Sequence, residues 1–198
     1  MGEKILPKGF FRNNPLDKFS AASIAHFTMT AGFNNETCQM LNEVTQKGIY
    51  TERLSRIAAE KAAIDQLDSG EAIVTFMRSK FDIANQQLLC RKALSMHADA
   101  VPLILHRYKT SYQDVFIDTA VYILAHAEKA YAEQLLQMYP QIRNPYARSL
   151  ACLVFGVQHI ESAAPLLLAE YERMKKEHIE ENLCQGPLLG LYCLYGKA

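Results

Sequence analysis

The chain has 198 residues, of which 49% are hydrophobic and 21% are charged. This is the composition of a folded globular protein, and it excludes a chain that is disordered throughout. Lys plus Arg and Asp plus Glu number 21 each, so the formal net charge of zero argues against a general nucleic-acid binder. No apolar run approaches the roughly 18 residues of a membrane-spanning helix.

The five cysteines form no CxxC pair, which makes them a poor basis for a disulfide framework or a zinc site. The first residues contain no apolar core of the kind found in a signal peptide. We therefore expect a cytoplasmic protein with reduced thiols and with neither a metal nor a cofactor.

Residues 1–14 are interrupted by Pro7, Gly9 and two consecutive Asn residues, and we expect them to form an extended leader. From residue 15 onward the apolar spacing predicts helices, with no alternation typical of strands. In the first half of the chain, the predicted helices span about 16–32, 35–47, 50–67 and 70–81.

The second half is more regular, because three segments that end in Tyr align at offsets of 31 and 32 residues: 100–108, 131–139 and 163–171. Two apolar columns and one Tyr column recur in them: Ile104, Leu135, Leu167; Leu105, Leu136, Leu168; and Tyr108, Tyr139, Tyr171. Pro102 and Pro165 are expected in the first turn of their helices, where a missing N–H costs nothing.

Each aligned segment follows a longer predicted helix, over about 83–97, 112–126 and 144–158. The repeating unit is therefore a helical hairpin, and stacked hairpins bury their apolar faces against each other in a solenoid. The alternative is an irregular helical bundle in which the spacing recurs by chance. A last, apolar helix is predicted over about 188–195.

The run Asn144-Pro-Tyr-Ala-Arg148-Ser-Leu-Ala-Cys-Leu-Val-Phe-Gly156, followed by Ala163-Ala-Pro165-Leu-Leu-Leu168, resembles a HEAT-type repeat. It is most similar to the short bacterial variety named after phycobilisome lyases, over about 144–171. The resemblance implies an all-α fold, a right-handed α-α superhelix of about 11 helices, and no particular activity. The implied domain covers 15–198, irregular over 15–70 and HEAT-like over 71–198.

Four His-x-acid triplets begin at His97, His126, His159 and His178. The first three fall where each repeat is expected to turn from its first helix to its second. Helix capping explains both residue types, since His donates to free carbonyls at a helix end and an acid favours the next N-terminus. A metal site or a pH-responsive or partner-binding ridge is the alternative, although stacked repeats hold histidines too far apart to converge easily on one ion.

The sequence contains no HExxH, GxGxxG, Walker or GxSxG motif, and we assign no catalytic residue. We expect a non-enzymatic scaffold or adaptor that binds a protein or peptide on the concave face of a short helical solenoid. In HEAT-like proteins the second helix of each pair usually lines that face. The candidate partner-binding residues are therefore the ones beside the apolar columns: His106, Arg107, Lys109, Gln134, Gln137, Met138, Glu170 and Arg173.

Two other functions stay open. A HEAT-like enzyme of the DNA-alkylation-repair glycosylase type would be expected to have a basic concave face and Trp residues, but this chain has no Trp and no net charge. A small-molecule binder would use the Tyr column, whose simpler role is core packing with hydroxyls at the rim.

The apolar helix at 188–195 must be covered by preceding residues, by another copy of the chain or by a partner. We expect self-association, as a homodimer through this helix, and no membrane association.

Overall fold

The computed structural model describes residues 49–178 and 181–196. These residues form nine α-helices and no strand, which confirms the all-α prediction for them. The count is nine rather than about 11, and the expected leader at 1–14 and helices over 16–32 and 35–47 lie outside the described residues. The helices are α3 (Ile49–Asp65), α4 (Gly70–Met77), α5 (Gln86–Ser95), α6 (His97–Tyr108), α7 (Asp114–His126), α8 (Lys129–Met138), α9 (Pro145–Val157), α10 (Ala164–Glu177) and α11 (Gln185–Tyr195).

The described residues divide into two compact units, one that contains 49–63 with 82–85 and the other 64–81 with 86–178 and 181–196. Because residues 15–48 are not described, the single domain predicted over 15–198 stays a prediction. Within the described ranges, no helix is both long and apolar enough to cross a bilayer.

In the first unit, Asp82 ties α3 to the 3₁₀ turn at 83–85. Its carboxylate accepts hydrogen bonds from Arg53 at 2.8 Å and from Arg56 at 3.2 Å. Its backbone N–H donates to the Glu60 carboxylate. The Arg53 hydrogen bond holds the pKa of Asp82 well below its ordinary value, so this carboxylate stays charged in the folded protein.

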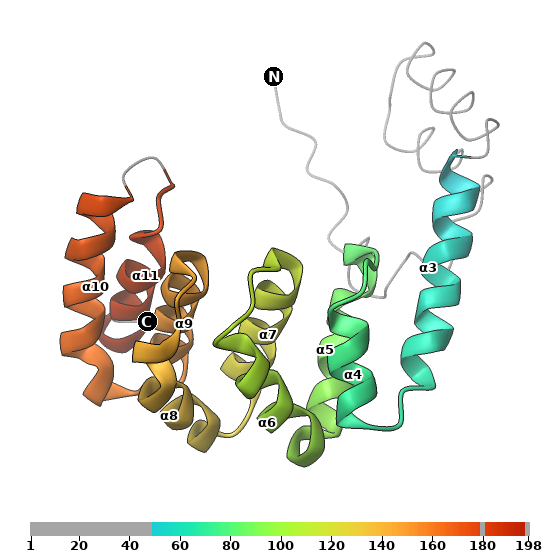
Figure 1. Cartoon of the computed structure of the whole chain (residues 1–198), viewed down its shortest axis with the longest axis horizontal. Helices are drawn as coiled ribbons and strands as arrows, with labels where there is room; N and C mark the ends of the chain where they lie inside the picture. The colour runs from blue at the N-terminus through green and yellow to red at the C-terminus, as the bar shows by residue number, and fades with distance from the viewer. Residues whose placement is uncertain (1–48, 179–180, 197–198) are drawn as a thin grey trace, which may run out of the picture. The chain divides into compact units, whose positions relative to one another are not determined.

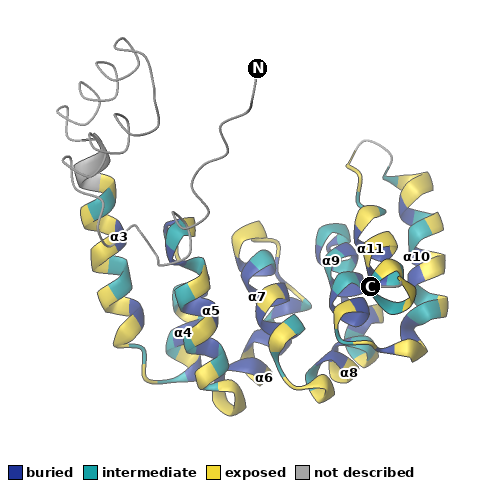
Figure 2. Ribbon diagram, turned by 180° about the vertical axis from the view of Figure 1, so that it is seen from behind, coloured by how far each residue is buried: buried dark blue, intermediate teal, exposed yellow. Residues whose placement is uncertain are grey.

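In the second unit the helices pack in two layers (Figure 1). Helices α5, α7, α9 and α11 pack one on the next, α4, α6 and α8 do the same, and α10 packs on α11. Helices that follow one another along the chain, such as α5 and α6, form hairpins. The buried residues lie on the facing sides of the helices (Figure 2), and the largest fully buried ones include Ile104, Phe116, Leu124, Leu135 and Phe155.

The three aligned segments lie in α6, α8 and α10, and their columns differ in burial. The first apolar column is fully buried at Ile104, Leu135 and Leu167. The second column loses burial along the chain, from 3% exposed at Leu105 to 53% exposed at Leu168. The repeats are therefore equivalent in the core but not at their margins.

Several predicted helix boundaries are wrong by three residues or more, including the end of α4 at Met77 and the start of α11 at Gln185. Helix α6 begins at His97, three residues early, so Pro102 is the sixth residue of the helix and removes one internal hydrogen bond. Helix α10 runs to Glu177, well past the predicted end at residue 171. Arg173 pairs with Glu170 and Glu177 at spacings of three and four residues, which supports the additional turns. Pro165 does lie in the first turn of α10, as predicted.

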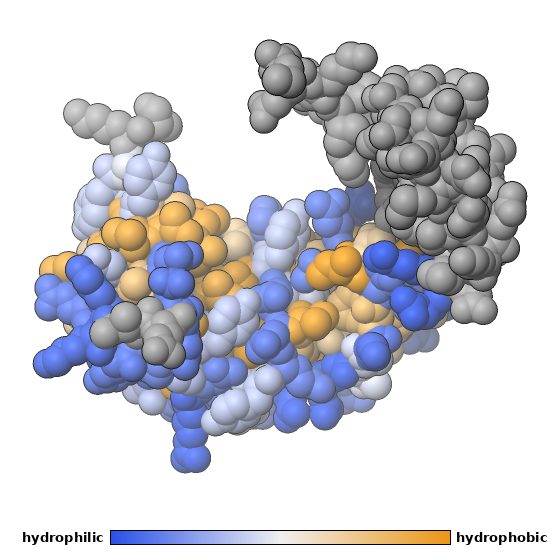
Figure 3. Space-filling model, turned by 90° about the horizontal axis from the view of Figure 1, so that it is seen from above, coloured by the Kyte–Doolittle hydropathy of each residue, from blue (hydrophilic) through white to orange (hydrophobic). Residues whose placement is uncertain are grey.

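Helix α11 packs on α9 almost backbone to backbone. A Cβ atom placed on Gly156 of α9 would overlap the backbone of Gly190 on α11, and one placed on Gly186 would overlap Ser149. Glycine is therefore required at this contact. The opposite face of α11 leaves four apolar or aromatic residues exposed: Leu188, Leu189, Tyr192 and Tyr195. Figure 3 shows hydrophobic residues, in orange, gathered at this end of the unit.

Candidate ligand-binding pocket

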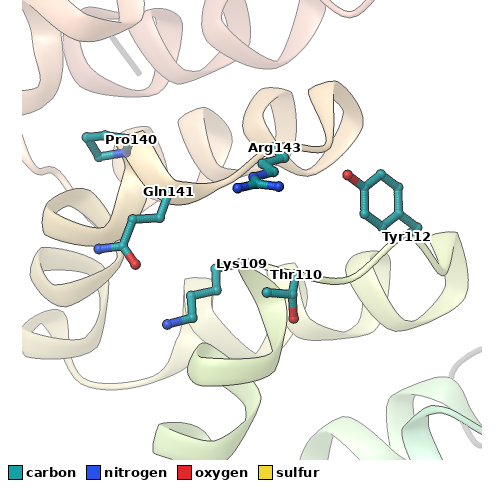
Figure 4. A pocket seen from close by; sticks show the side chains of 6 residues that line it. All are labelled: Lys109, Thr110, Tyr112, Pro140, Gln141 and Arg143. Carbon is teal, nitrogen blue, oxygen red and sulfur yellow. The ribbon is translucent and has the colours of Figure 1, made fainter.

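An open pocket of about 610 Å³ lies between the ends of two successive hairpins. One wall comes from the loop between α6 and α7, and the other from the segment between α8 and α9. The two groups of lining residues are related by the same offset that relates Tyr108 to Tyr139, so equivalent positions of two repeats form the pocket. The lining residues are shown in Figure 4: Lys109, Thr110, Tyr112, Pro140, Gln141 and Arg143.

Buried residues between the lining positions hold the two walls together. The side-chain amide of Asn144 donates to the carbonyl of Ser111 across the two loops, at 3.2 Å. The oxygen of the same amide accepts from the N–H of Tyr146 and caps α9. Ser111, Ile142 and Asn144 are all buried. The residues that alternate with them, at 110, 112, 141 and 143, are exposed to solvent.

Arg148, on α9, holds the pocket wall that the segment between α8 and α9 forms. Its guanidinium donates to the carbonyls of Tyr139 and Ile142, at 3.5 and 3.3 Å, and lies over the Tyr139 ring. It also pairs with Glu170, which in turn pairs with Arg173. Burial alone would raise the pKa of Glu170, but hydrogen bonds from Arg173 and Arg148 hold it below its ordinary value. The carboxylate therefore stays charged and keeps Arg148 in place.

The positive charge of the pocket is not balanced within it. Lys109 and Arg143 come from different walls, and the structure shows no ion pair for either among the described residues. No carboxylate lines the pocket. The Tyr112 side chain is 68% exposed, and Figure 4 shows its hydroxyl directed toward the side on which Arg143 lies. The pocket is therefore suited to an anionic ligand that also accepts hydrogen bonds.

Of the eight predicted partner-binding residues, Lys109 is the one that lines this pocket. Glu170 and Arg173 are brought together in an ion pair, and Glu170 is buried with only 6% exposed, so it offers no free surface. The remaining five are half-buried or exposed on α6 and α8: His106, Arg107, Gln134, Gln137 and Met138.

The other five pocket residues were not predicted, because partner contacts were expected on the second helices rather than on the segments that follow them. The signal was present in the repeat itself. The offset that aligns Tyr108 with Tyr139 also aligns Lys109 with Pro140 and Tyr112 with Arg143. No equivalent loop follows Tyr171, because α10 continues as a helix.

The His-x-acid triplets connect consecutive turns. His97, the first residue of α6 rather than a turn residue, lies 3.1 Å from the Glu128 carboxylate of the next repeat. Lys129 then donates to the carbonyl of His159 in the repeat after that. His126 lies 2.8 Å from the carbonyl of Tyr122, one turn back along α7, and its ring stacks on that of Tyr122. No group of three His, Cys, Asp or Glu residues in the described ranges is placed to hold a metal ion.

The Tyr column belongs to the core rather than to a rim. The buried hydroxyl of Tyr108 donates to the carbonyl of Ala147 at 2.7 Å. The hydroxyl of Tyr139 lies 3.4 Å from the sulfur of Cys152, and burial raises the pKa of Tyr139. Tyr171 is half-buried, with Lys175 over its ring. The expectation of hydroxyls at the rim is therefore wrong for the first two tyrosines.

The chain matches no known protein family, and no curated protein or solved structure is significantly similar to it.

Proposed function

We propose that the protein is a non-enzymatic interaction module, a scaffold or adaptor that binds a segment of another protein in the pocket between the two loops. The observation that supports this most directly is the construction of the pocket from equivalent positions of successive repeats. Exposed Tyr and Arg side chains, here Tyr112 and Arg143, are the types that contribute most to protein interfaces. The loops are already held in place by Asn144 and Arg148, which lowers the ordering cost of binding.

We also propose that the second unit is a HEAT-like solenoid that functions in the cytoplasm. Two features support the solenoid: the helices alternate between two layers, and the column of Ile104, Leu135 and Leu167 is buried in successive hairpins. The cytoplasmic location is supported by the four described cysteines, all of which are free thiols.

The two alternative functions have less support. A DNA glycosylase needs a cationic stripe along a phosphate backbone, whereas the pocket offers two cations. A small-molecule binder based on the Tyr column would need open tyrosines, whereas Tyr108 and Tyr139 are buried and hydrogen-bonded.

Site-specific photocrosslinking tests the proposed function. A benzoylphenylalanine placed at Tyr112 should crosslink a discrete protein from native lysate, and the purified partner should then compete for that site. The matched control is the same substitution at Tyr122, which is also exposed but lies outside the pocket on α7. Equal crosslinking at both positions, or none at Tyr112, would contradict a protein-binding pocket.

The exposed face of α11 favours self-association as a second property. The helix Gln185–Tyr195 contains no charged residue, so two copies of this face can meet without charge repulsion. We propose that a second copy of the chain covers Leu188 and Tyr192, which are 49% and 67% exposed. Sedimentation equilibrium should show a dimer that Tyr192→Glu disrupts and Tyr122→Glu does not; a monomer at tens of micromolar would exclude it.

A further inference from the structure

We infer that the pocket between the α6–α7 and α8–α9 loops recognises carboxylate side chains, so that its ligand is an acidic peptide segment. The inference rests on the proposed function and adds the chemistry of the partner to it. The starting point is the charge of the pocket. Lys109 and Arg143 supply two positive charges from opposite walls, and none of the six lining residues is acidic.

Two other arginines of the second unit, unlike the two pocket cations, are engaged by carboxylates of the chain itself. Arg148 and Arg173 are both engaged by Glu170, and Arg173 also pairs with Glu177. Lys109, which is half-buried, and Arg143, which is exposed, line the pocket without an ion pair among the described residues. A carboxylate of a ligand would supply the partner that the chain itself does not, and Arg can engage it through two parallel hydrogen bonds.

The remaining lining residues fit a polypeptide better than a bare anion. The Gln141 amide can donate to and accept from a peptide backbone, and the Thr110 hydroxyl can do the same. The Tyr112 ring and Pro140 offer apolar surface for the carbon chains between carboxylates. A volume of about 610 Å³ accommodates several side chains rather than a single inorganic ion.

A phosphate backbone is a poorer fit than an acidic peptide. Nucleic-acid binding depends on releasing counterions from a row of phosphates, and affinity grows with the number of cations that face them. The pocket presents two cations in a chain whose formal net charge is zero. Two carboxylates on a peptide match this number, whereas a nucleic acid would bring further phosphates that meet no cation.

The test uses an array of short peptides that carry two or three Glu residues at varied spacing, each beside its Gln counterpart. The full-length protein should bind a subset of the Glu peptides, and fluorescence anisotropy in solution should show at least about tenfold weaker binding of the Gln counterparts. Lys109→Gln and Arg143→Gln should each weaken binding about two- to fivefold, as expected for exposed ion pairs, and the double variant about tenfold. Binding should weaken further as salt rises.

The matched controls are Arg91→Gln and Lys176→Gln, which remove exposed cations of the same unit outside the pocket and should leave affinity unchanged. Circular dichroism checks that all five variants fold, the double variant included. Equal binding of Glu and Gln peptides, or no loss in the Lys109 and Arg143 variants, would overturn the inference. So would tighter, pocket-dependent binding of a single-stranded oligodeoxynucleotide.

The crosslinking and peptide-binding experiments together distinguish a failure of this inference from a failure of the proposed function. If a protein crosslinks at Tyr112 but no acidic peptide binds, the pocket is an interaction site for a different chemistry. If neither occurs, both proposals fail.

Discussion

Helix α9 contacts its two layer neighbours in different ways. Toward α7, long side chains span the contact: Tyr146 donates to Asp118, and Gln158 donates to three carbonyls at the end of α7. Toward α11, Gly156 meets Gly190 and no side chain separates the two backbones. One face of the helix is thus held by hydrogen bonds at side-chain distance, and the other by direct backbone packing.

The difference between its two sides shows how α9 contributes both to the pocket, on the α7 side, and to a structural contact, on the α11 side. Side chains at both ends of α9 donate hydrogen bonds to the region of α7, and the pocket opens between the loops that lead into these two helices. Backbone packing on α11 leaves no room for even one added methyl group. Substitutions on the two faces should therefore fail in different ways.

The largest effect is expected on the α11 side. Gly156→Ala forces a Cβ atom against the backbone of Gly190, so the helices must separate. Overpacking and the lost contacts should exceed the gain of about 1 kcal/mol in helix propensity, leaving a net destabilisation of about 2–3 kcal/mol. Urea denaturation measures it, with the exposed neighbour Val157→Ala as a control that should change stability little.

A smaller effect is expected for Glu170→Gln. Glu170 holds Arg148, and Arg148 donates hydrogen bonds to two carbonyls of the pocket wall. The variant keeps the shape of the side chain but removes the charge that Arg148 and Arg173 share, and should cost about 2 kcal/mol at neutral pH. Lys175→Gln, on the exposed side of the same helix, is the control.

The stability difference between wild type and Glu170→Gln should depend on pH with a definite sign. The pKa of Glu170 is lowered in the folded state, so its stabilisation is complete above the ordinary value of 4.5 and declines as pH falls below that value through the folded-state pKa. The gap between wild type and Glu170→Gln should therefore narrow in acid. A gap that stays constant from pH 7 to strongly acidic solution would exclude this role for the carboxylate.

The Asn144→Asp variant separates the two roles of Asn144, which are the hydrogen bond between the two loops and the cap of α9. The carboxylate can still cap α9 by accepting from Tyr146, but it cannot donate to the Ser111 carbonyl. We expect a loss of about 1 kcal/mol and faster hydrogen exchange confined to the pocket loops. Asn144→Ala removes both interactions and should cost more, and an Asn144→Asp variant as stable as wild type would contradict the cross-loop hydrogen bond.

The smallest expected change is a gain in stability. His159 follows α9 with a φ of 50°, and its N–H donates to Gly156 while that of Ile160 donates to Phe155, the hydrogen-bond pattern of a Schellman C-cap. Because glycine is the residue favoured at such a position, His159→Gly should stabilise the protein by about 0.5–1 kcal/mol. Asn182→Gly, at a φ of 52°, should gain less because Asn tolerates this conformation better. Thermal unfolding compares the two.

The helices of the second unit were predictable because their apolar spacing repeats. Ile104, Leu135 and Leu167 are buried as the period requires. Helix ends were less predictable, since they depend on contacts that spacing does not encode. The extension of α10 depends on the Arg173 pairs, and the early start of α6 depends on backbone hydrogen bonds from Asp99 and Ala100 to the Met96 carbonyl.

The pocket was only partly predictable. Lys109 was selected as a polar residue beside the apolar columns, but Glu170 was selected by the same rule and is buried in an ion pair. Glu170 is paired with Arg148 of α9 and with Arg173, and the period of the sequence does not reveal these pairs. The glycine contact between α9 and α11 could not be predicted from the sequence either, because it depends on how closely two distant segments approach each other.

The buried thiols of the second unit make its stability measurable by chemical modification of the native chain. Cys90 and Cys152 are free and buried, and burial raises the pKa of each to about 12. Since thiolates rather than thiols react with alkylating reagents, both cysteines are protected in the folded state. Cys184 and Cys193 are half-buried at α11. Mass-resolved alkylation of these four sulfurs would therefore follow, in a single experiment, how the α11 contact and the interior of the helical layers open.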